Sequence, residues 1–198
     1  MTGVQTCALP ILASTVDLVL LGLVHDQSRS AYDIQKHIEY RNLSYWVKIS
    51  TPSIYKRMIV LEESGYLKKK IIKNGKNPEK AIYKITQKGL EYFDIMMEEF
   101  SKKSFQVLFD FNAVIVGLNK VSKGEALQYV ENIQKNIEES LSFITITRQQ
   151  KKNIPLVGRT IMKQQIMVLD SLQKWCIEFK QEIENEESLE KMQELGGE

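Results

Sequence analysis

The sequence has few of the residues that hold a fold together covalently or through a metal ion. Among its 198 residues there are two cysteines, Cys7 and Cys176, and two histidines. A disulfide framework needs several cysteines and a cysteine metal site needs closely spaced pairs, so we expect neither. We predict no metal, no cofactor and a reducing compartment, the cytoplasm.

Long apolar runs and a secretory leader are also missing. The longest nearly continuous apolar stretch, Val16–Val24, has about half of the roughly 20 residues that a membrane-spanning helix needs. The first residues show neither a basic segment nor a small-residue cleavage pattern, which argues against a signal peptide. We therefore expect no membrane partner, and we interpret residues 1–12 as a non-native or disordered leader.

Motifs of catalysis are missing as well. The sequence shows no nucleophile motif, no HExxH pattern and no phosphate-binding glycine loop. Its acidic pairs, such as Glu62-Glu63, are adjacent on predicted helices and so point in different directions. A solvated surface explains them better than a general acid and base, so we predict that the protein is not an enzyme and has no catalytic residues.

What the sequence does have is a basic middle. The net charge of the whole chain is only +2, yet residues 41–90 hold 12 lysines and arginines against three acidic residues. Residues 91–198 hold 13 basic and 18 acidic residues. Because the positive charge is concentrated in one segment, an acidic partner is expected to bind there.

Local signals between residues 13 and 90 predict three helices, a two-stranded hairpin and the start of a fourth helix. The helices begin at capping residues, which are Ser14 or Thr15, Ser30 with Asp33, Ser50 or Thr51, and Thr86. Pro52 suits the first position of the third helix and Gly65 its end. Two runs rich in β-branched and aromatic residues, 66–73 and 80–85, flank a turn-rich loop and form the hairpin.

This order of elements is the plan of a winged helix-turn-helix domain that binds duplex DNA. A helix fits the major groove, while a hairpin reaches the phosphate backbone or the minor groove. The candidate DNA-binding residues are Ser50, Thr51, Ser53, Tyr55, Lys56 and Arg57 on the third helix, and Lys73, Lys76 and Lys80 on the hairpin. Lys68, Lys69 and Lys70 alternate between faces and cannot all meet one phosphate strand. The alternative is that these lysines only solvate a surface hairpin.

The second half of the chain is predicted to be helical and to associate. Two long helices with heptad spacing are separated at Ile154-Pro155, which favours an antiparallel pair. The candidate dimerisation residues are Leu127, Val130, Ile137, Met162, Leu169, Leu172, Cys176 and Phe179. We therefore predict a mainly α protein with a winged helix domain at 13–90, a linker helix and coiled-coil-like dimerisation domain at 91–187, and an acidic tail at 188–198.

Aromatic residues suggest one further site. Trp46, Phe109 and Trp175 could line an apolar pocket for a small effector between the winged domain and the dimer helices. Ordinary core packing is the alternative interpretation for each of them. Cys176 occupies a heptad position, which favours an inert buried thiol over a redox sensor.

Four stretches resemble the PadR family of transcriptional regulators. They are LLGLV at 20–24, SAYDI at 30–34, SIYKRMIVLEESGYL at 53–67 and YKITQKG at 83–89. The family often has proline after the tyrosine, where this chain has Lys56, and that change adds charge on the face expected to enter the groove. The length of the helical second half is similar to the longer PadR subgroup. The resemblance implies a homodimer that represses transcription and releases DNA on binding a small effector.

Together these observations predict a sequence-specific regulator that binds a palindromic operator as a homodimer. An adaptor that uses a winged helix and coiled helices to bind other proteins is the alternative. Duplex binding with a steep salt dependence would separate the two, because phosphate contacts release counterions. A MarR-like regulator is a second alternative within DNA binding, but the short start before the first helix argues against it.

Overall fold

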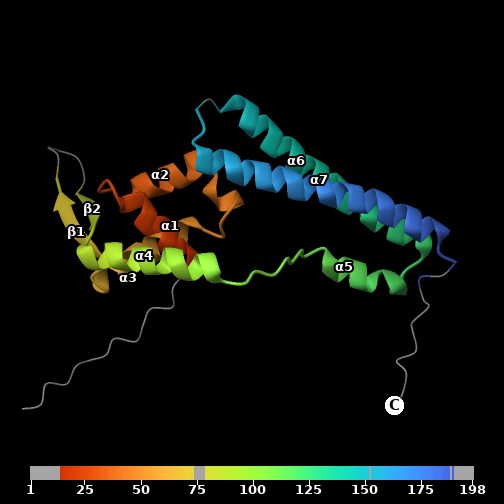
Figure 1. The fold of residues 1–198 in the computed structure, drawn as a ribbon, viewed down its shortest axis with the longest axis horizontal. Coiled ribbons are helices and arrows are strands. Elements are labelled where there is room, and N and C mark those ends of the chain that lie inside the picture. Colours follow the sequence, from red (N-terminus) through yellow and green to blue (C-terminus); the bar gives the residue numbers. More distant parts are fainter. Residues whose placement is uncertain (1–13, 74–78, 152, 188, 190–198) are drawn as a thin grey trace, which may run out of the picture. The chain divides into compact units, whose positions relative to one another are not determined.

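The computed structural model describes residues 14–73, 79–151, 153–187 and 189. The chain divides into two compact units, with the boundary between Phe105 and Gln106. Each unit is described by itself below (Figure 1). The leader predicted at 1–12 lies outside the described residues, as does nearly all of the predicted acidic tail.

The first unit is a winged helix. Its elements are α1 (Thr15–Val24), α2 (Ala31–Arg41), the short 3₁₀ helix η1 (Leu43–Tyr45), α3 (Thr51–Glu63), β1 (Leu67–Ile72), β2 (Lys80–Ile85) and α4 (Gln87–Lys102). The strands pair antiparallel and form the hairpin that we call the wing. The predicted fold class, three helices followed by a two-stranded wing, is confirmed.

The helices begin and end where local chemistry predicts. Ser30 and Asp33 form a reciprocal capping box at the start of α2, and Ser50 with Ser53 does the same for α3. Each box satisfies backbone N–H groups that have no partner within the helix. Gly65 follows α3 with a φ of +76°, a left-handed conformation that glycine adopts without steric cost. The chain therefore turns directly from α3 into the wing.

The core of this unit joins all of its helices to the wing. Leu20, Ile34, Ile54 and Met58 expose 1% or less of their surface. Met96 of α4 is also fully buried in this core, and α4 packs against α1. The unit therefore extends to the end of α4, past the boundary at residue 90 that the sequence suggested.

A close backbone approach fixes the wing to α4. The hydroxyl of Thr86 donates to the carbonyls of Gly65 (2.7 Å) and Tyr66 (3.1 Å) and accepts from the N–H of Gly89 (3.0 Å). A Cβ atom on Gly89 would lie 2.2 Å from the Tyr66 carbonyl oxygen. That oxygen belongs to the backbone, so it cannot move away without distorting the chain. Glycine is therefore required at position 89.

The second unit is built on a helical hairpin. It contains α5 (Asn112–Gly117), the 3₁₀ helix η2 (Leu118–Lys120), α6 (Lys123–Gln150) and α7 (Leu156–Asn185). Figure 1 shows α6 and α7 side by side, as the predicted antiparallel pair requires. Within the part of the chain that the structure describes, no helix is long and apolar enough to cross a membrane.

The heptad residues pack within one chain. Val130, Ile137, Met162 and Cys176 each expose 5% or less of their surface within the single chain. The other predicted dimerisation residues, Leu127, Leu169, Leu172 and Phe179, are half-buried against the same cluster. The stripe assigned to a seam between subunits is thus used first to hold α6 against α7. An intrachain and an interchain antiparallel pair have the same heptad pattern, so the sequence did not distinguish them.

Candidate nucleic-acid interface

The first turns of α3 present an exposed polar surface. Thr51, Tyr55 and Lys56 are exposed. Ser50 and Ser53 hold the helix start, since the Ser53 hydroxyl donates to the Ser50 carbonyl at 2.6 Å and accepts from the Ser50 N–H at 3.0 Å. Among the described residues, Lys56 has no ion-pair or hydrogen-bonding partner. Its ammonium group is therefore available to a partner molecule.

The Arg57 side chain on α3 points toward α1 and not toward the surface that the sequence analysis assigned to DNA. Its guanidinium donates two hydrogen bonds to Asp17 of α1, from Nε to Oδ1 at 2.6 Å and from Nη2 to Oδ2 at 2.5 Å. Asp17 is fully buried and the Arg57 side chain is only 22% exposed. The hydrogen bond to Asp17 raises the pKa of Arg57, against the opposing effect of burial. This guanidinium is committed to the fold, so the structure argues against its assignment to base readout.

Asp17 itself carried the signal that the sequence analysis missed. It is the one charged residue in the apolar stretch of α1. A buried carboxylate is costly without a partner, so an acidic residue in a core helix predicts a basic one packed against it. Tyr92 of α4 lies in the same region, and burial, followed by the charge of Asp17, raises the pKa of its hydroxyl.

Tyr55 connects α3 to α2. Its hydroxyl donates to Oε1 of Gln35 at 3.3 Å, and Gln35 in turn donates to Glu39 at 2.7 Å. Tyr55 as a whole remains 42% exposed. Tyr55 is thus held by its tip while its ring stays on the surface of α3.

The wing lysines differ from one another in their surroundings. Lys80 pairs with Asp33 at 2.9 Å, and Lys69 pairs with Glu62 at 3.6 Å. Burial opposes ionisation of Asp33, but hydrogen bonds from Lys80 and Ser30 outweigh it and lower the pKa of this carboxyl. Lys73 is exposed at the end of the wing, and Lys76 lies outside the described residues. Lys84, which the sequence analysis did not select, is exposed on β2.

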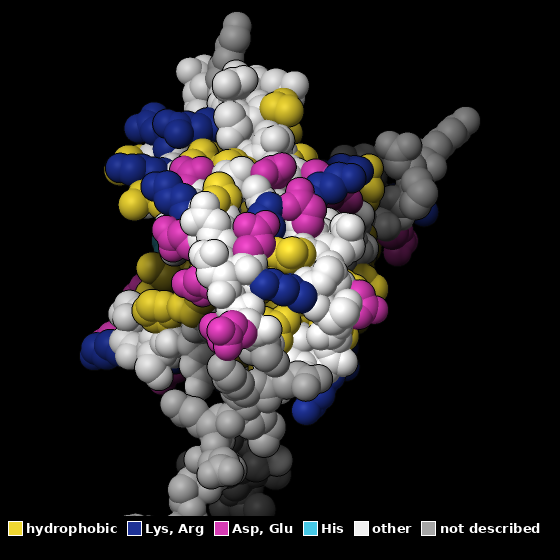
Figure 2. All heavy atoms as spheres, turned by 90° about the vertical axis from the view of Figure 1, so that its right-hand side faces the viewer, with side chains coloured by type: hydrophobic (Ala, Val, Ile, Leu, Met, Phe, Trp, Pro, Cys, Tyr) yellow, Lys and Arg dark blue, Asp and Glu magenta, His cyan; other side chains and the backbone are white. Residues whose placement is uncertain are grey.

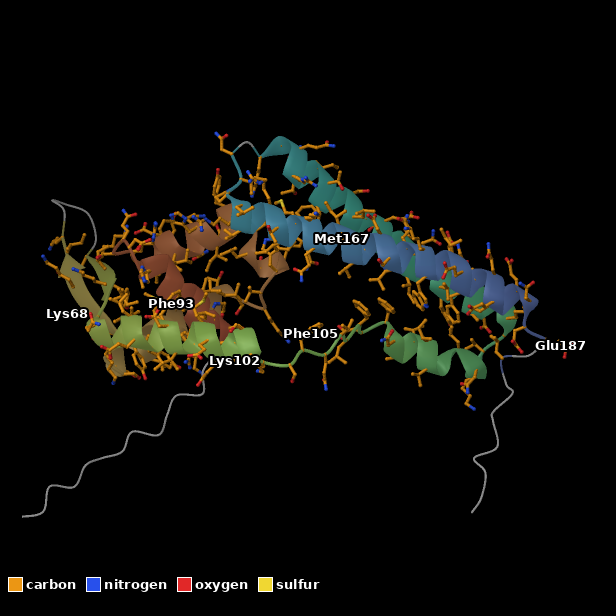
Figure 3. The ribbon with its side chains drawn as sticks, in the orientation of Figure 1. Lys68, Phe93, Lys102, Phe105, Met167 and Glu187 are labelled. Carbon is orange, nitrogen blue, oxygen red and sulfur yellow. The ribbon has the colours of Figure 1, made fainter. Side chains whose placement is uncertain are left out.

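The aromatic residues of the second unit form a ladder. Phe109, Phe111, Trp175 and Phe179 stack in sequence, with ring centroids 5.1 to 5.7 Å apart. Beside the ladder is a hollow of about 480 Å³ lined by Phe109, Met167, Val168, Ser171, Leu172 and Trp175; Met167 is labelled in Figure 3. Two of the three predicted effector residues, Phe109 and Trp175, therefore line one hollow. The third, Trp46, belongs to the other unit, where its ring lies 6.2 Å from that of Tyr45.

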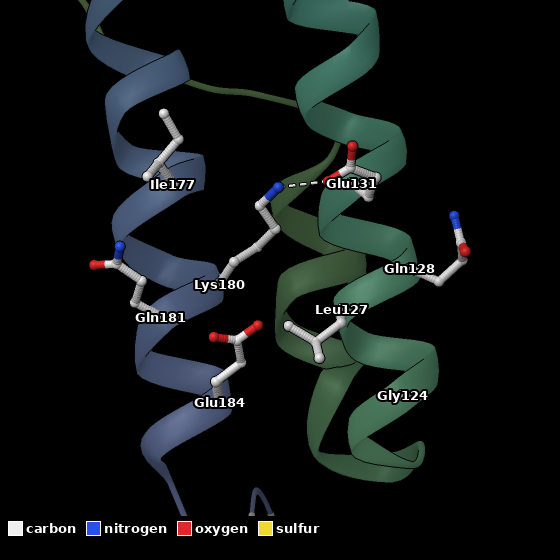
Figure 4. Close-up of a pocket in the computed structure, with 8 residues that line it drawn as sticks. All are labelled: Gly124, Leu127, Gln128, Glu131, Ile177, Lys180, Gln181 and Glu184. Carbon is white, nitrogen blue, oxygen red and sulfur yellow. Dashed lines mark hydrogen bonds and ion pairs between the residues drawn. The ribbon is translucent and has the colours of Figure 1, made fainter.

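A second depression of about 470 Å³ lies between α6 and α7 (Figure 4). Lys180 of α7 reaches across it to Glu131 of α6 and forms an ion pair. Its lining mixes these charges with Leu127, Ile177 and uncharged polar groups. Since Glu131 already neutralises Lys180, this groove has no free charge from these two residues to bind a ligand. The aromatic hollow is therefore the better candidate for a ligand site. Figure 2 likewise shows acidic, basic and apolar side chains interspersed on the face that it draws.

Comparisons with known proteins agree with this geometry. The family model of a winged helix DNA-binding domain matches residues 31–103. A structure of Bacillus subtilis PadR in complex with operator DNA superposes with a TM-score of 0.70 at 16% identity, covering 86% of this chain and 99% of that one. This chain has the PadR fold. No curated protein matches it in sequence.

Two further solved structures extend the comparison. A PadR-like regulator from Bacillus cereus superposes with a TM-score of 0.64 at 19% identity, over 85% of this chain and 98% of that one. The Vibrio cholerae virulence activator AphA also has a TM-score of 0.64, at 17% identity, over 86% of this chain and 98% of that one. The predicted resemblance to PadR is confirmed at the level of the fold.

The buried ion pair generates a stability prediction. Replacing Arg57 by Ala leaves the Asp17 carboxylate buried without a partner, which should lower the free energy of unfolding by about 3–5 kcal/mol. Lys56→Ala, one residue away but exposed, should change it by less than about 0.5 kcal/mol. Urea denaturation followed by circular dichroism measures both. Equal stability of the two variants would show that the ion pair does not hold α1 to α3.

Proposed function

We propose that this protein is a sequence-specific DNA-binding transcriptional regulator that acts as a homodimer. The observation that carries the proposal is the winged helix itself, with an exposed start of α3 and a wing rich in lysine within the most basic segment of the chain. Operator DNA is bound by the PadR protein of Bacillus subtilis, whose fold this chain shares. Palindromic operators follow from two-fold symmetry, since each subunit would place one α3 in a major groove.

Lys56 is our candidate for direct base readout. It is exposed on α3 and unpaired among the described residues, in contrast to its neighbour Arg57. Lysine can donate to the O6 and N7 acceptors of guanine in the major groove. We interpret Thr51 and Tyr55 as neighbouring contacts, and Ser50 and Ser53 as the residues that fix the start of the helix.

Selection of bound sequences from a random pool of duplex DNA tests this role. Lys56→Ala should change the preferred base at one position in each half-site, with a loss of discrimination of about 1–3 kcal/mol. Lys135→Ala, which removes an exposed lysine from α6 in the other unit, should select the same sequences as the unmodified protein. Identical selections from all three proteins would remove Lys56 from base readout.

Dimerisation is supported by apolar residues that the single chain leaves uncovered. Leu156 and Val157 at the start of α7 are 69% and 72% exposed, and Met167 is 59% exposed. Ile146 of α6 is 50% exposed, near the same connected end of the hairpin. Large exposed apolar patches mark interfaces. We propose that a second copy covers this end of the hairpin.

Charges placed on that surface should separate the subunits. The double variant Leu156→Glu, Val157→Glu would bury unpaired carboxylates at the contact. We expect dimerisation at least 100-fold weaker, about 2.7 kcal/mol, as measured by sedimentation at several concentrations. Glu178→Lys, an exposed charge change farther along α7, should leave the dimer intact. A double variant that remains dimeric would place the contact elsewhere.

The aromatic hollow supports regulation by a small apolar or aromatic effector that releases DNA. Bacillus subtilis PadR has been crystallised with p-coumaric acid. In this chain the lining of the hollow contains no charged side chain, so we propose that an uncharged planar compound is preferred. Whether the protein represses or activates does not follow from the fold, since AphA is an activator; we propose repression from the resemblance to PadR.

Fluorescence of Trp175 provides the test. In a Trp46→Phe background, p-coumaric acid and its uncharged methyl ester should quench Trp175, the ester more strongly. An effector that lowers operator affinity tenfold requires about 1.4 kcal/mol of coupling. Linkage is reciprocal, so operator DNA must weaken effector binding by the same factor. A compound bound equally well with and without operator is not an effector.

A further inference from the structure

Arg29, in the connection between α1 and α2, joins three elements of the first unit, which Figure 1 labels. Its backbone exchanges two hydrogen bonds with Tyr83 of β2, at 3.0 and 2.8 Å. Its guanidinium donates to the carbonyl of Leu23, in the last turn of α1, at 2.8 Å, and to Nε2 of His37 on α2 at 2.5 Å. The bridge to Tyr83 joins a single residue on each side. The attachment of the wing therefore depends on where Arg29 is held.

The contact with Arg29 decides which nitrogen of His37 carries a proton. A guanidinium has five N–H donors and no acceptor. Nε2 must therefore accept, which places the proton of the neutral imidazole on Nδ1. Nδ1 is buried and has no hydrogen-bonding partner among the residues that the structure describes. Only the neutral ring can thus make this hydrogen bond with Arg29.

A second proton on His37 would find no acceptor. At Nε2 it would face an N–H group of Arg29, so that repulsion between two positive groups would replace the hydrogen bond. The N–H group at Nδ1 would remain buried without a partner in the described part of the chain. Protonation of His37 therefore breaks the link between Arg29 and α2.

The other charged groups around the imidazole do not offset this repulsion. Burial, followed by the charges of Arg29 and Arg41, lowers the pKa of His37 from its ordinary value of 6.5. Asp33 of α2 acts in the opposite direction, but its carboxylate is already paired with Lys80 of β2 at 2.9 Å. The neutral ring stabilises the fold fully above pH 6.5, and this contribution is lost as the pH falls from 6.5 through the lowered pKa.

We propose that His37 and Arg29 form a pH-sensitive latch on the wing. The neutral imidazole holds Arg29 in place, and protonation of the ring releases Arg29 and loosens its bridge to Tyr83. A loosened wing no longer keeps a fixed position beside α3, so operator affinity falls in acid. This last step rests on the proposed function, whereas the latch itself does not.

Titration of the imidazole by NMR is the direct test. The chain has two histidines, and His25→Gln removes the other one, which is exposed and pairs with Asp26. Proton–nitrogen correlations across the ring should show the Nδ1–H tautomer of His37 in mild alkali and a pKa below 6.5. An Nε2–H tautomer, or a pKa of 6.5 or higher, would overturn the latch.

Hydrogen exchange tests whether the latch holds the wing. His37→Gln cannot be protonated, yet its amide oxygen can still accept from Arg29. At one pH unit below the measured pKa, the backbone N–H groups of Arg29 and Tyr83 should exchange about tenfold faster in the unmodified protein than in His37→Gln. His25→Gln is the matched control and should exchange like the unmodified protein. Equal exchange in the unmodified protein and His37→Gln would contradict the proposal.

Operator affinity tests the effect on DNA binding, with a duplex recovered by selection from random DNA. At the same pH the unmodified protein should bind about tenfold more weakly than His37→Gln for each subunit on the DNA, whereas well above the pKa the two should bind equally. Equal affinities at both pH values would overturn the control of DNA binding by the latch. If no duplex is bound at either pH, the proposed function fails, while the titration and exchange results still decide the latch.

Discussion

The ion pair between Asp17 and Arg57 is the interaction on which the orientation of α3 depends. It joins the first turn of α1 to the helix that presents Lys56 and Tyr55 to solvent, through two short hydrogen bonds. When two charges are buried, their mutual attraction offsets the free energy of desolvation only if the geometry and the hydrogen bonding are favourable. Apolar residues could hold α1 against α3 in several rotations, whereas a bidentate pair is satisfied in one. We interpret the pair as the element that specifies the angle of α3 rather than as a large source of stability.

Arg57 and Lys56 show how adjacent residues on one helix acquire opposite roles. Successive helical residues are about 100° apart, so one of the two points toward α1 and the other toward solvent. Arginine suits the buried role because its planar fork matches a carboxylate. Lysine suits the exposed one, as a flexible point charge. The wing repeats this division, since Lys69 pairs with Glu62 on the inner face while Lys68 and Lys70 are unpaired on the outer face.

The hydrophobic residues of the second unit fall into two groups: one is buried within the helical hairpin, and the other remains exposed on its surface. The most regular heptad stripe is buried between α6 and α7; it includes Val130, Ile137 and Cys176. Burial raises the pKa of the Cys176 thiol, as expected of an inert core cysteine. The less regular apolar residues near the connected end, Leu156 and Val157 among them, remain exposed. We therefore propose that two copies associate through exposed residues such as Leu156 and Val157, which lie outside the heptad pattern.

The sequence by itself determined the features that depend on neighbouring residues. The helix caps at Ser30 and Ser50, the turn at Gly65 and the strands of the wing all arise from contacts within a few residues, or from the alternation of a strand. They could be predicted because their partners lie at fixed short spacings. The resemblance to PadR rested on the same elements in the same order.

Only the tertiary structure decided which distant residues meet. Asp17 and Arg57 are 40 positions apart, and no local rule pairs one acid with one of many basic residues. A heptad stripe has the same form whether its partner is the same chain or another copy, so the burial of Val130 and Ile137 within one chain required the fold. The strand register places Lys68 opposite Lys84. A shift of one residue would turn every side chain of the strand to the other face, so this pairing also required the fold.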